Sequence, residues 1–130
     1  VYVEGDLNVD THHTIEDTGI VLGRAIADAI GDKKGIRRFG FFLLPMDETL
    51  SLAAIDLSGR PFLKYQAEFT VEFFYAVSYS AMMNLHLKIV DDGNNHHMAE
   101  ALFKSFGKSL HMAVSFEPGI TDVWSTKGSL

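Results

Sequence analysis

Two stretches of this 130-residue chain share one pattern, and this repeat constrains the fold more than any other feature of the sequence. The first begins at His12 (HHTIEDTGIVLGRAI) and the second at His96 (HHMAEALFKSFGKSL). Both read His-His-x-x-Glu, then six residues, then Gly, a basic residue, a small residue and an aliphatic residue. A second chance copy of so long a pattern is very rare. We therefore interpret the repeat as an internal duplication and expect two related halves.

Hydrophobic periodicity predicts the secondary structure. Apolar residues at intervals of three and four are typical of amphipathic helices, and strict alternation is typical of strands. Gly19 and Gly23 lie inside the first predicted helix, where glycine lowers helix propensity, so we expect close packing against a neighbour there. The pattern predicts one compact α+β unit with helices in one layer and strands in the other. Helices are expected at 15–30, 71–85 and 96–114, and strands at 1–9, within 37–70 and at 84–90.

The composition excludes several classes of protein. Hydrophobic residues make up 47% of the chain and charged residues 22%, which excludes intrinsic disorder. The formal net charge of −6 argues against a nucleic-acid partner, and no apolar run reaches the roughly 18 residues of a membrane helix. The chain has no Cys, hence no disulfide or thiolate metal site, and no signal-peptide pattern follows Val1. We expect a cytoplasmic protein.

The repeated motif has the chemistry of a metal site. On a helix, residues four apart share a face, so His12 lies beside Glu16 and His96 beside Glu100. Adjacent His residues point roughly 100° apart on a helix, so each pair is expected to serve two different ions. Nitrogen and carboxylate ligands without Cys favour Mn²⁺, Fe²⁺ or Zn²⁺.

The simpler interpretation is that these His residues cap a helix or face solvent. For any single His it is the better expectation, but two identical motifs inside a longer repeat argue against it. His86 and His111 have no carboxylate at ligand spacing, and we expect them to be structural.

Several segments of the chain together resemble the imidazoleglycerol-phosphate dehydratase family. They are GDLNVDTHHTIEDTGIVLG, IRRFG, PMDETL, DLSGRP, NNHHMAEALFKSFGKSL and the terminal STKG. The resemblance implies a duplicated fold like domain 2 of ribosomal protein S5, with one domain over residues 1–130 and repeats of roughly 1–69 and 70–130. It also implies a 24-subunit homo-oligomer with two Mn²⁺ per subunit in sites shared between subunits. The reaction would be dehydration of imidazole glycerol phosphate to imidazole acetol phosphate in histidine biosynthesis.

The resemblance also assigns roles to single residues. Glu16 and Glu100 would both bind metal and move a proton. Asp47 is a further candidate for handling or orienting a proton, and a helix-capping or solvated role is its equally weighted alternative. Glu72 is a weaker ligand candidate, because the family commonly has His at that position. The metal ligands would be His12, His13, Glu16, His96, His97 and Glu100, and the substrate phosphate would be bound by Arg38, Arg60, Ser125 and Lys127.

The chain departs from the family pattern in three places. Family members have a longer N-terminal stretch that supplies another metal ligand, so we expect the first half to be incomplete here. They usually carry additional residues between Thr70 and Val71, where this sequence has no turn signal. Trp124 replaces the Pro usual before STKG.

Two other functions fit the motifs taken alone. One is a di-metal hydrolase of a small phosphorylated substrate, since paired ions also activate water. The other is a module in which metal ions only join subunits. The cations Arg38, Arg60 and Lys127 favour a phosphorylated ligand over the second alternative.

Overall fold

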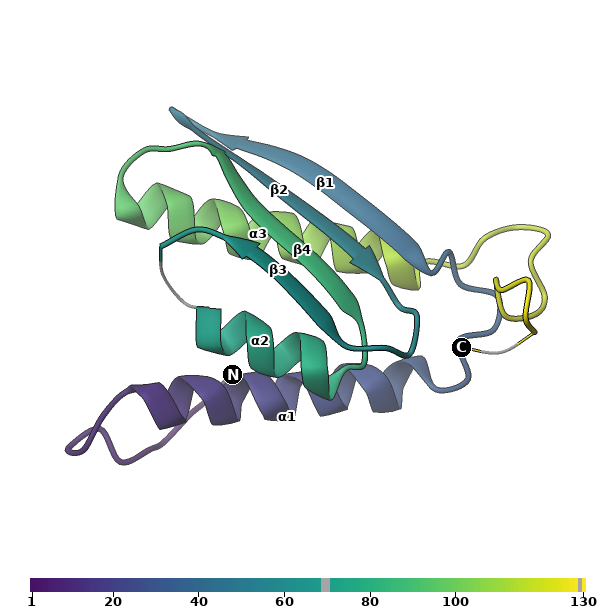
Figure 1. The fold of residues 1–130 in the computed structure, drawn as a ribbon, viewed down its shortest axis with the longest axis horizontal. Helices are drawn as coiled ribbons and strands as arrows, with labels where there is room; N and C mark the ends of the chain where they lie inside the picture. Colours follow the sequence, from purple (N-terminus) through teal and green to yellow (C-terminus); the bar gives the residue numbers. More distant parts are fainter. Residues whose placement is uncertain (69–70, 129) are drawn as a thin grey trace.

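The computed structural model describes residues 1–68, 71–128 and 130, and it confirms the predicted α+β class. Helices and strands alternate irregularly along the chain (Figure 1). In chain order the elements are α1 (His12–Ile30), β1 (Phe39–Met46), β2 (Thr49–Asp56), β3 (Phe62–Gln66), α2 (Val71–Ser80), β4 (Asn84–Asp91) and α3 (Asn95–Val114).

The four strands form one mixed sheet in the order β1-β2-β4-β3. β1 and β2 are an antiparallel hairpin in which Met46 pairs with Thr49, so that Asp47 and Glu48 form the turn. β4 runs antiparallel to β2 and parallel to β3. The parallel pair needs a crossover, and α2 provides it.

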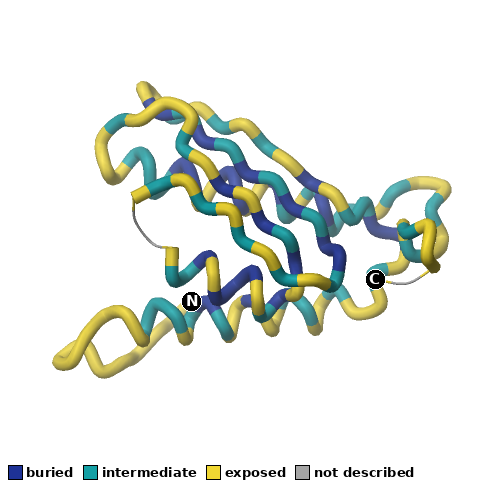
Figure 2. The backbone as a smooth tube through the Cα atoms, in the orientation of Figure 1, coloured by how far each residue is buried: buried dark blue, intermediate teal, exposed yellow. Residues whose placement is uncertain are grey.

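The helices cover one face of the sheet. α3 lies across β1 and β2, α2 packs on β3, and α1 packs on α2 (Figure 1). In β2, burial alternates along the strand, as a sheet with one covered face requires (Figure 2). The uncovered face keeps large apolar side chains exposed, among them Phe39, Phe41, Leu43 and Phe62. The largest fully buried apolar side chains are Phe74, Leu57, Met83, Leu85, Leu87, Leu102 and Val77.

The C-terminal tail folds back along the segment that leads into β1. Bridges pair Ile36 with Phe116 and Lys34 with Val123. The backbone N–H of Arg38 donates to the carbonyl of Ala113 at 2.9 Å, at the end of α3. Residues 115–128 are therefore held beside the start of β1.

Gly19 and Gly23 are buried where α1 crosses α2, which confirms the close packing expected there. A Cβ at Gly19 would lie 2.6 Å from the carbonyl oxygen of Phe73. A Cβ at Gly23 would lie 2.6 Å from Cβ of Ser80 and 2.8 Å from the carbonyl oxygen of Val77. Only a residue without a side chain lets the two helices approach this closely.

Two secondary-structure predictions were wrong. The expected strand at 1–9 is irregular chain with a turn, because its alternating residues pair with no strand in the described part of the molecule. α2 ends at Ser80, before the predicted end at residue 85, because Met82 takes a left-handed φ of 53°.

Other expectations stay open. The expected gap between Thr70 and Val71 lies outside the described residues. The division into repeats near residue 70 stays a prediction, although strands from both sides of it, β3 and β4, pair in one sheet. Within the described residues, no helix combines the length and apolar character needed to cross a membrane.

We expect Gly23→Ala to lower the free energy of unfolding by about 1–3 kcal/mol, because the added methyl group forces α1 away from α2. Urea denaturation monitored by circular dichroism measures the change. The matched control is Gly107→Ala in α3, where an added Cβ meets nothing within 4 Å. The control should be neutral or stabilising by up to about 1 kcal/mol, and equal losses in both variants would contradict the packing argument.

Candidate functional site

The predicted site residues lie in three places: the start of α1 beside α2, the start of α3 beside the β1–β2 turn, and the C-terminal tail beside the start of β1. Arg38 directly precedes this strand and Asp47 directly follows it. A strand rises about 3.3 Å per residue, so the two lie roughly 25–30 Å apart. The starts of α1 and α3 lie toward the same end of the molecule as the β1–β2 turn, and the C-terminal tail lies toward the other (Figure 1). We call these the turn end and the tail end.

At the turn end, α3 begins with one copy of the repeated motif. Nε2 of His96 lies 3.1 Å from Oε2 of Glu100, the contact predicted from their spacing. Glu100 also receives a hydrogen bond from Nζ of Lys104 at 2.6 Å, and this bond is the main cause of its lowered pKa. Lys104 was not singled out in the sequence, although it lies four residues after Glu100.

His97 points to the β1–β2 turn instead. Its Nδ1 lies 3.0 Å from Oε2 and 3.1 Å from Oε1 of Glu48. Its Nε2 lies 3.8 Å from Oδ2 of Asp47. Asp47 was singled out in the sequence and Glu48 was not, because only the register of the hairpin brings the turn to the start of α3.

The other copy of the motif opens α1. Nδ1 of His12 lies 3.9 Å from Oε1 of Glu72 at the start of α2. Glu16 lies near Tyr75, whose pKa is raised mainly by the hydrogen bond to Tyr79 and to a lesser degree by the charge of Glu16. His13 lines a groove between residues 1–6 and α1.

The two His pairs have nearly the same geometry. The ring centroids of His12 and His13 are 6.1 Å apart at an interplanar angle of 74°, and those of His96 and His97 are 6.2 Å apart at 65°. The two copies of the motif therefore hold their His pairs in nearly the same relative orientation.

The donor set fits a divalent cation of the first transition series. Among the described residues, one ligand atom each from Asp47, Glu48 and His97 lie within 4.8 Å of one another. Carboxylate oxygens with imidazole nitrogens suit Mn²⁺, Fe²⁺ or Zn²⁺. Within the described residues, this is the one group of three or more possible metal ligands. Neither the motif at the start of α1 nor Glu100 belongs to such a group.

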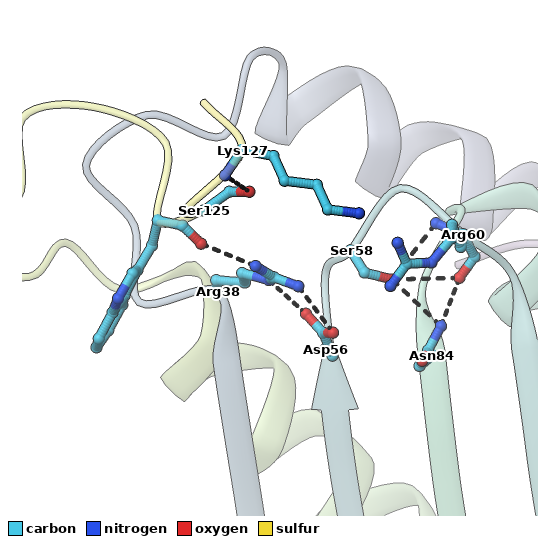
Figure 3. A network of polar contacts seen from close by, with 8 residues as sticks. Arg38, Asp56, Ser58, Arg60, Asn84, Ser125 and Lys127 are labelled. Carbon is cyan, nitrogen blue, oxygen red and sulfur yellow. Dashed lines mark hydrogen bonds and ion pairs between the residues drawn. The ribbon is translucent and has the colours of Figure 1, made fainter. Parts of the chain in front are cut away.

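At the tail end, Arg38 organises a second cluster (Figure 3). Its Nε and Nη2 donate to the two carboxylate oxygens of Asp56 at 2.6 and 3.0 Å, and its Nη1 donates to the carbonyl of Trp124 at 2.8 Å. The Arg38 and Asp56 side chains are only 14% and 23% exposed, so this bidentate pair is shielded from solvent. Arg38 therefore fixes the tail on the sheet.

The remaining predicted phosphate ligands gather round the same pocket (Figure 3). The Arg60 carbonyl accepts a hydrogen bond from Nδ2 of Asn84 at 2.6 Å, which fixes the turn before β3. The backbone N–H of Lys127 donates to Oγ of Ser125 at 3.2 Å. The structure thus brings together Arg38, Arg60, Ser125 and Lys127, which are far apart in sequence.

Asp56 and Lys33 lie beside this pocket and were not singled out in the sequence. Nζ of Lys33 lies 3.5 Å from where a Cβ of Gly59 would be, and Gly59 lines the pocket. Burial lowers the pKa of Lys33, and the charge of Asp56 partly opposes this shift. Asp56 meets Arg38 only because β1 and β2 pair with Phe39 opposite Asp56.

Comparison with known proteins connects this geometry to one family. The family model for imidazoleglycerol-phosphate dehydratase matches residues 1–110 of the chain. The chain is 58% identical to the imidazoleglycerol-phosphate dehydratase of Lachnoclostridium phytofermentans and 51% identical to that of Streptococcus mutans. Both alignments cover 100% of this chain, with 72% and 73% of the relatives. They run over 142 positions against 130 residues here, so these relatives carry residues without a counterpart in this chain.

Solved structures of the same enzyme share the fold. The imidazoleglycerol-phosphate dehydratase of Staphylococcus aureus matches with a TM-score of 0.79 and 39% identity, over 83% of this chain and 70% of that one. The Pyrococcus furiosus protein, solved in complex with (S)-C348, matches with a TM-score of 0.79 and 34% identity. The match covers 92% of this chain and 71% of that one.

We expect Arg38→Lys to release the tail, because lysine cannot make the planar contact with Asp56 and reach Trp124 together. Faster amide hydrogen exchange at Gly35, whose N–H donates to Asp122, measures the release. The free energy of unfolding should fall by about 1–3 kcal/mol. Arg24→Lys on the exposed face of α1 is the control, and unchanged exchange at Gly35 in Arg38→Lys would contradict the role of Arg38.

Proposed function

This chain belongs to the imidazoleglycerol-phosphate dehydratase family, whose members are hydro-lyases of histidine biosynthesis, and we propose that it dehydrates imidazole glycerol phosphate with bound Mn²⁺. In this reaction a proton leaves one carbon of the glycerol chain and hydroxide leaves its neighbour. Water is released, and the resulting enol becomes the ketone of imidazole acetol phosphate. The observation that carries the proposal is the presence, on one family fold, of two helix starts with paired His and Glu side chains and of a separate cationic pocket.

The pocket at the tail end would bind the substrate phosphate. Arg60 and Lys127 supply positive charge, and Ser125 supplies a hydroxyl donor. Arg38 would contribute N–H groups held in place by Asp56, with much of its charge already neutralised. Phosphate binding here would orient the rest of the substrate. The reacting carbons would then lie against the proposed metal ligands and proton carriers.

The groups at the turn end would hold the metal and the imidazole ring. His12, His13, Glu16, His96, His97 and Glu100 are the proposed ligands, with Glu72 as a weaker one. When bound, two Mn²⁺ per subunit would act as Lewis acids that stabilise negative charge on the imidazole ring, and Fe²⁺ or Zn²⁺ are possible substitutes. Asp47, whose side chain is 76% exposed, is a proposed proton carrier, and Glu16 and Glu100 are the others.

The distance between the two ends supports active sites shared between subunits. Roughly 25–30 Å of strand separates Arg38 from Asp47. An imidazole ring, a three-carbon chain and a phosphate are far shorter than this, so one molecule cannot reach both groups of one chain. We propose that the phosphate pocket of one subunit faces the metal ligands of another in a closed homo-oligomer, expected to be a 24-mer.

A cytoplasmic location is part of the same proposal and follows from the place of this reaction in amino-acid biosynthesis. A di-metal hydrolase of a small phosphate ester remains the alternative for the metal chemistry. It predicts release of inorganic phosphate from the substrate, whereas dehydration leaves the phosphate attached to the product.

We expect His96→Ala to lower kcat/KM for imidazole glycerol phosphate by about 100-fold or more, because it removes a proposed metal ligand. Bound Mn²⁺ should fall in the same variant, measured by elemental analysis after dialysis. His111→Ala, in the last turn of the same helix, is the matched control and should keep both metal and activity. Full activity of a metal-free His96→Ala protein would overturn the metal dependence.

Mixed assemblies test the shared site. Arg60→Ala and His96→Ala should each be inactive alone, since one lacks a phosphate ligand and the other a metal ligand. Co-assembled in equal amounts, they should recover up to about a quarter of the wild-type activity, because some sites then combine the two intact groups. Failure to recover activity in assemblies shown to contain both variants would place the whole site in one chain.

A further inference from the structure

One carboxylate joins the β1–β2 turn to the start of α3. Oε1 of Glu48 accepts hydrogen bonds from the backbone N–H of Asn94 at 2.9 Å and from Nδ2 of Asn94 at 3.4 Å. Both oxygens of the same carboxylate lie within 3.1 Å of Nδ1 of His97. Glu48 therefore contacts the helix cap and a proposed metal ligand together.

The surrounding backbone holds Glu48 in this place. Asn94 is the N-cap of α3, and its Oδ1 accepts from the backbone N–H of His97 at 2.9 Å. Gly93 passes so close to the turn that a Cβ there would collide with the side chains of Glu48 and Thr49. Glu48, Asn94 and His97 each contact the other two. The imidazole of His97 therefore has one favoured orientation.

The charge of Glu48 decides which nitrogen of His97 carries the proton. Both carboxylate oxygens of Glu48 face N–H donors, because Oε1 accepts from the backbone N–H and Nδ2 of Asn94 and both oxygens contact Nδ1 of His97. Near neutral pH this side chain is a carboxylate, which only accepts hydrogen bonds. Nδ1 of His97 must therefore donate, and in the neutral ring Nε2 keeps the free lone pair. Nε2 is the nitrogen that faces Asp47, 3.8 Å away.

We propose that Glu48 is a positioning residue that holds His97 through Nδ1–H, so that Nε2 is presented toward Asp47 as a metal ligand. The metal part rests on the proposed function, whereas the orientation of the ring does not. A carboxylate behind a ligating imidazole fixes its tautomer and raises its basicity. His96 has a different arrangement, because its Nε2 faces Glu100 of its own helix. The assignment explains why a second acidic residue follows Asp47 in the turn.

Glu48→Gln tests the proposal, because glutamine keeps the size of the side chain and removes its charge. Mn²⁺ affinity should fall about 10–100-fold while the number of ions bound per subunit stays unchanged, as expected for a group that supports a ligand. Electron paramagnetic resonance of free Mn²⁺ measures both quantities. Asp28→Asn, an exposed carboxylate-to-amide change near the end of α1, is the matched control and should change neither.

A second measurement is independent of metal. Solid-state NMR of the metal-free protein labelled with ¹⁵N-histidine should show an Nδ1–H tautomer in the wild type that Glu48→Gln converts partly to Nε2–H. Unchanged tautomers, or unchanged Mn²⁺ affinity in a variant that does change the tautomer, would overturn the positioning role. Loss of one whole Mn²⁺ per subunit would make Glu48 a direct ligand and also overturn it. If the wild type binds no Mn²⁺, the proposed function fails, and the tautomer result still decides the orientation of His97.

Discussion

The structure depends on the close contact of α3 with β1 and β2. Gly40 gives β1 no side chain where α3 crosses it, and a Cβ there would collide with the backbone at Ser109. Two buried hydroxyls complete the contact, since Oγ of Ser51 donates to the carbonyl of Ala101 at 2.9 Å and Oγ of Ser109 donates to that of Ala53 at 3.0 Å. Each of these two hydroxyls thus finds its partner in the opposite layer, as burial without water requires.

This contact also explains where the two groups of functional residues lie. A helix of 20 residues is about 30 Å long, and a strand of eight residues about 27 Å, so α3 and β1 match in length and run in opposite directions. At one end the turn after β1 meets the start of α3 through Glu48 and Asn94. At the other, Arg38 meets the end of α3 through Ala113. The residues at the β1–β2 turn and those around Arg38 are therefore held by the two ends of one pair of packed elements.

The sequence predicts what depends on local periodicity and misses what depends on register. The helices α1 and α3, the strand β4 and the packing at Gly19 follow from spacing along the chain, whereas β1, β2 and β3 were expected only as strands somewhere within 37–70. Glu48 and Asp56 could not be selected in this way, because each acquires its partner only when the strands align. The strand expected at 1–9 was wrong for a related reason, since alternation describes a side-chain pattern but supplies no neighbouring strand.

The length of β1 has a thermodynamic consequence. If one substrate must touch the tail end of one subunit and the turn end of another, ligand binding and subunit association are linked equilibria. A compact substrate mimic then has no complete site on a dissociated chain, and its binding free energy adds to that of association. Each bound ligand would then stabilise the contact between two subunits, and the oligomer would be most stable at high substrate concentration.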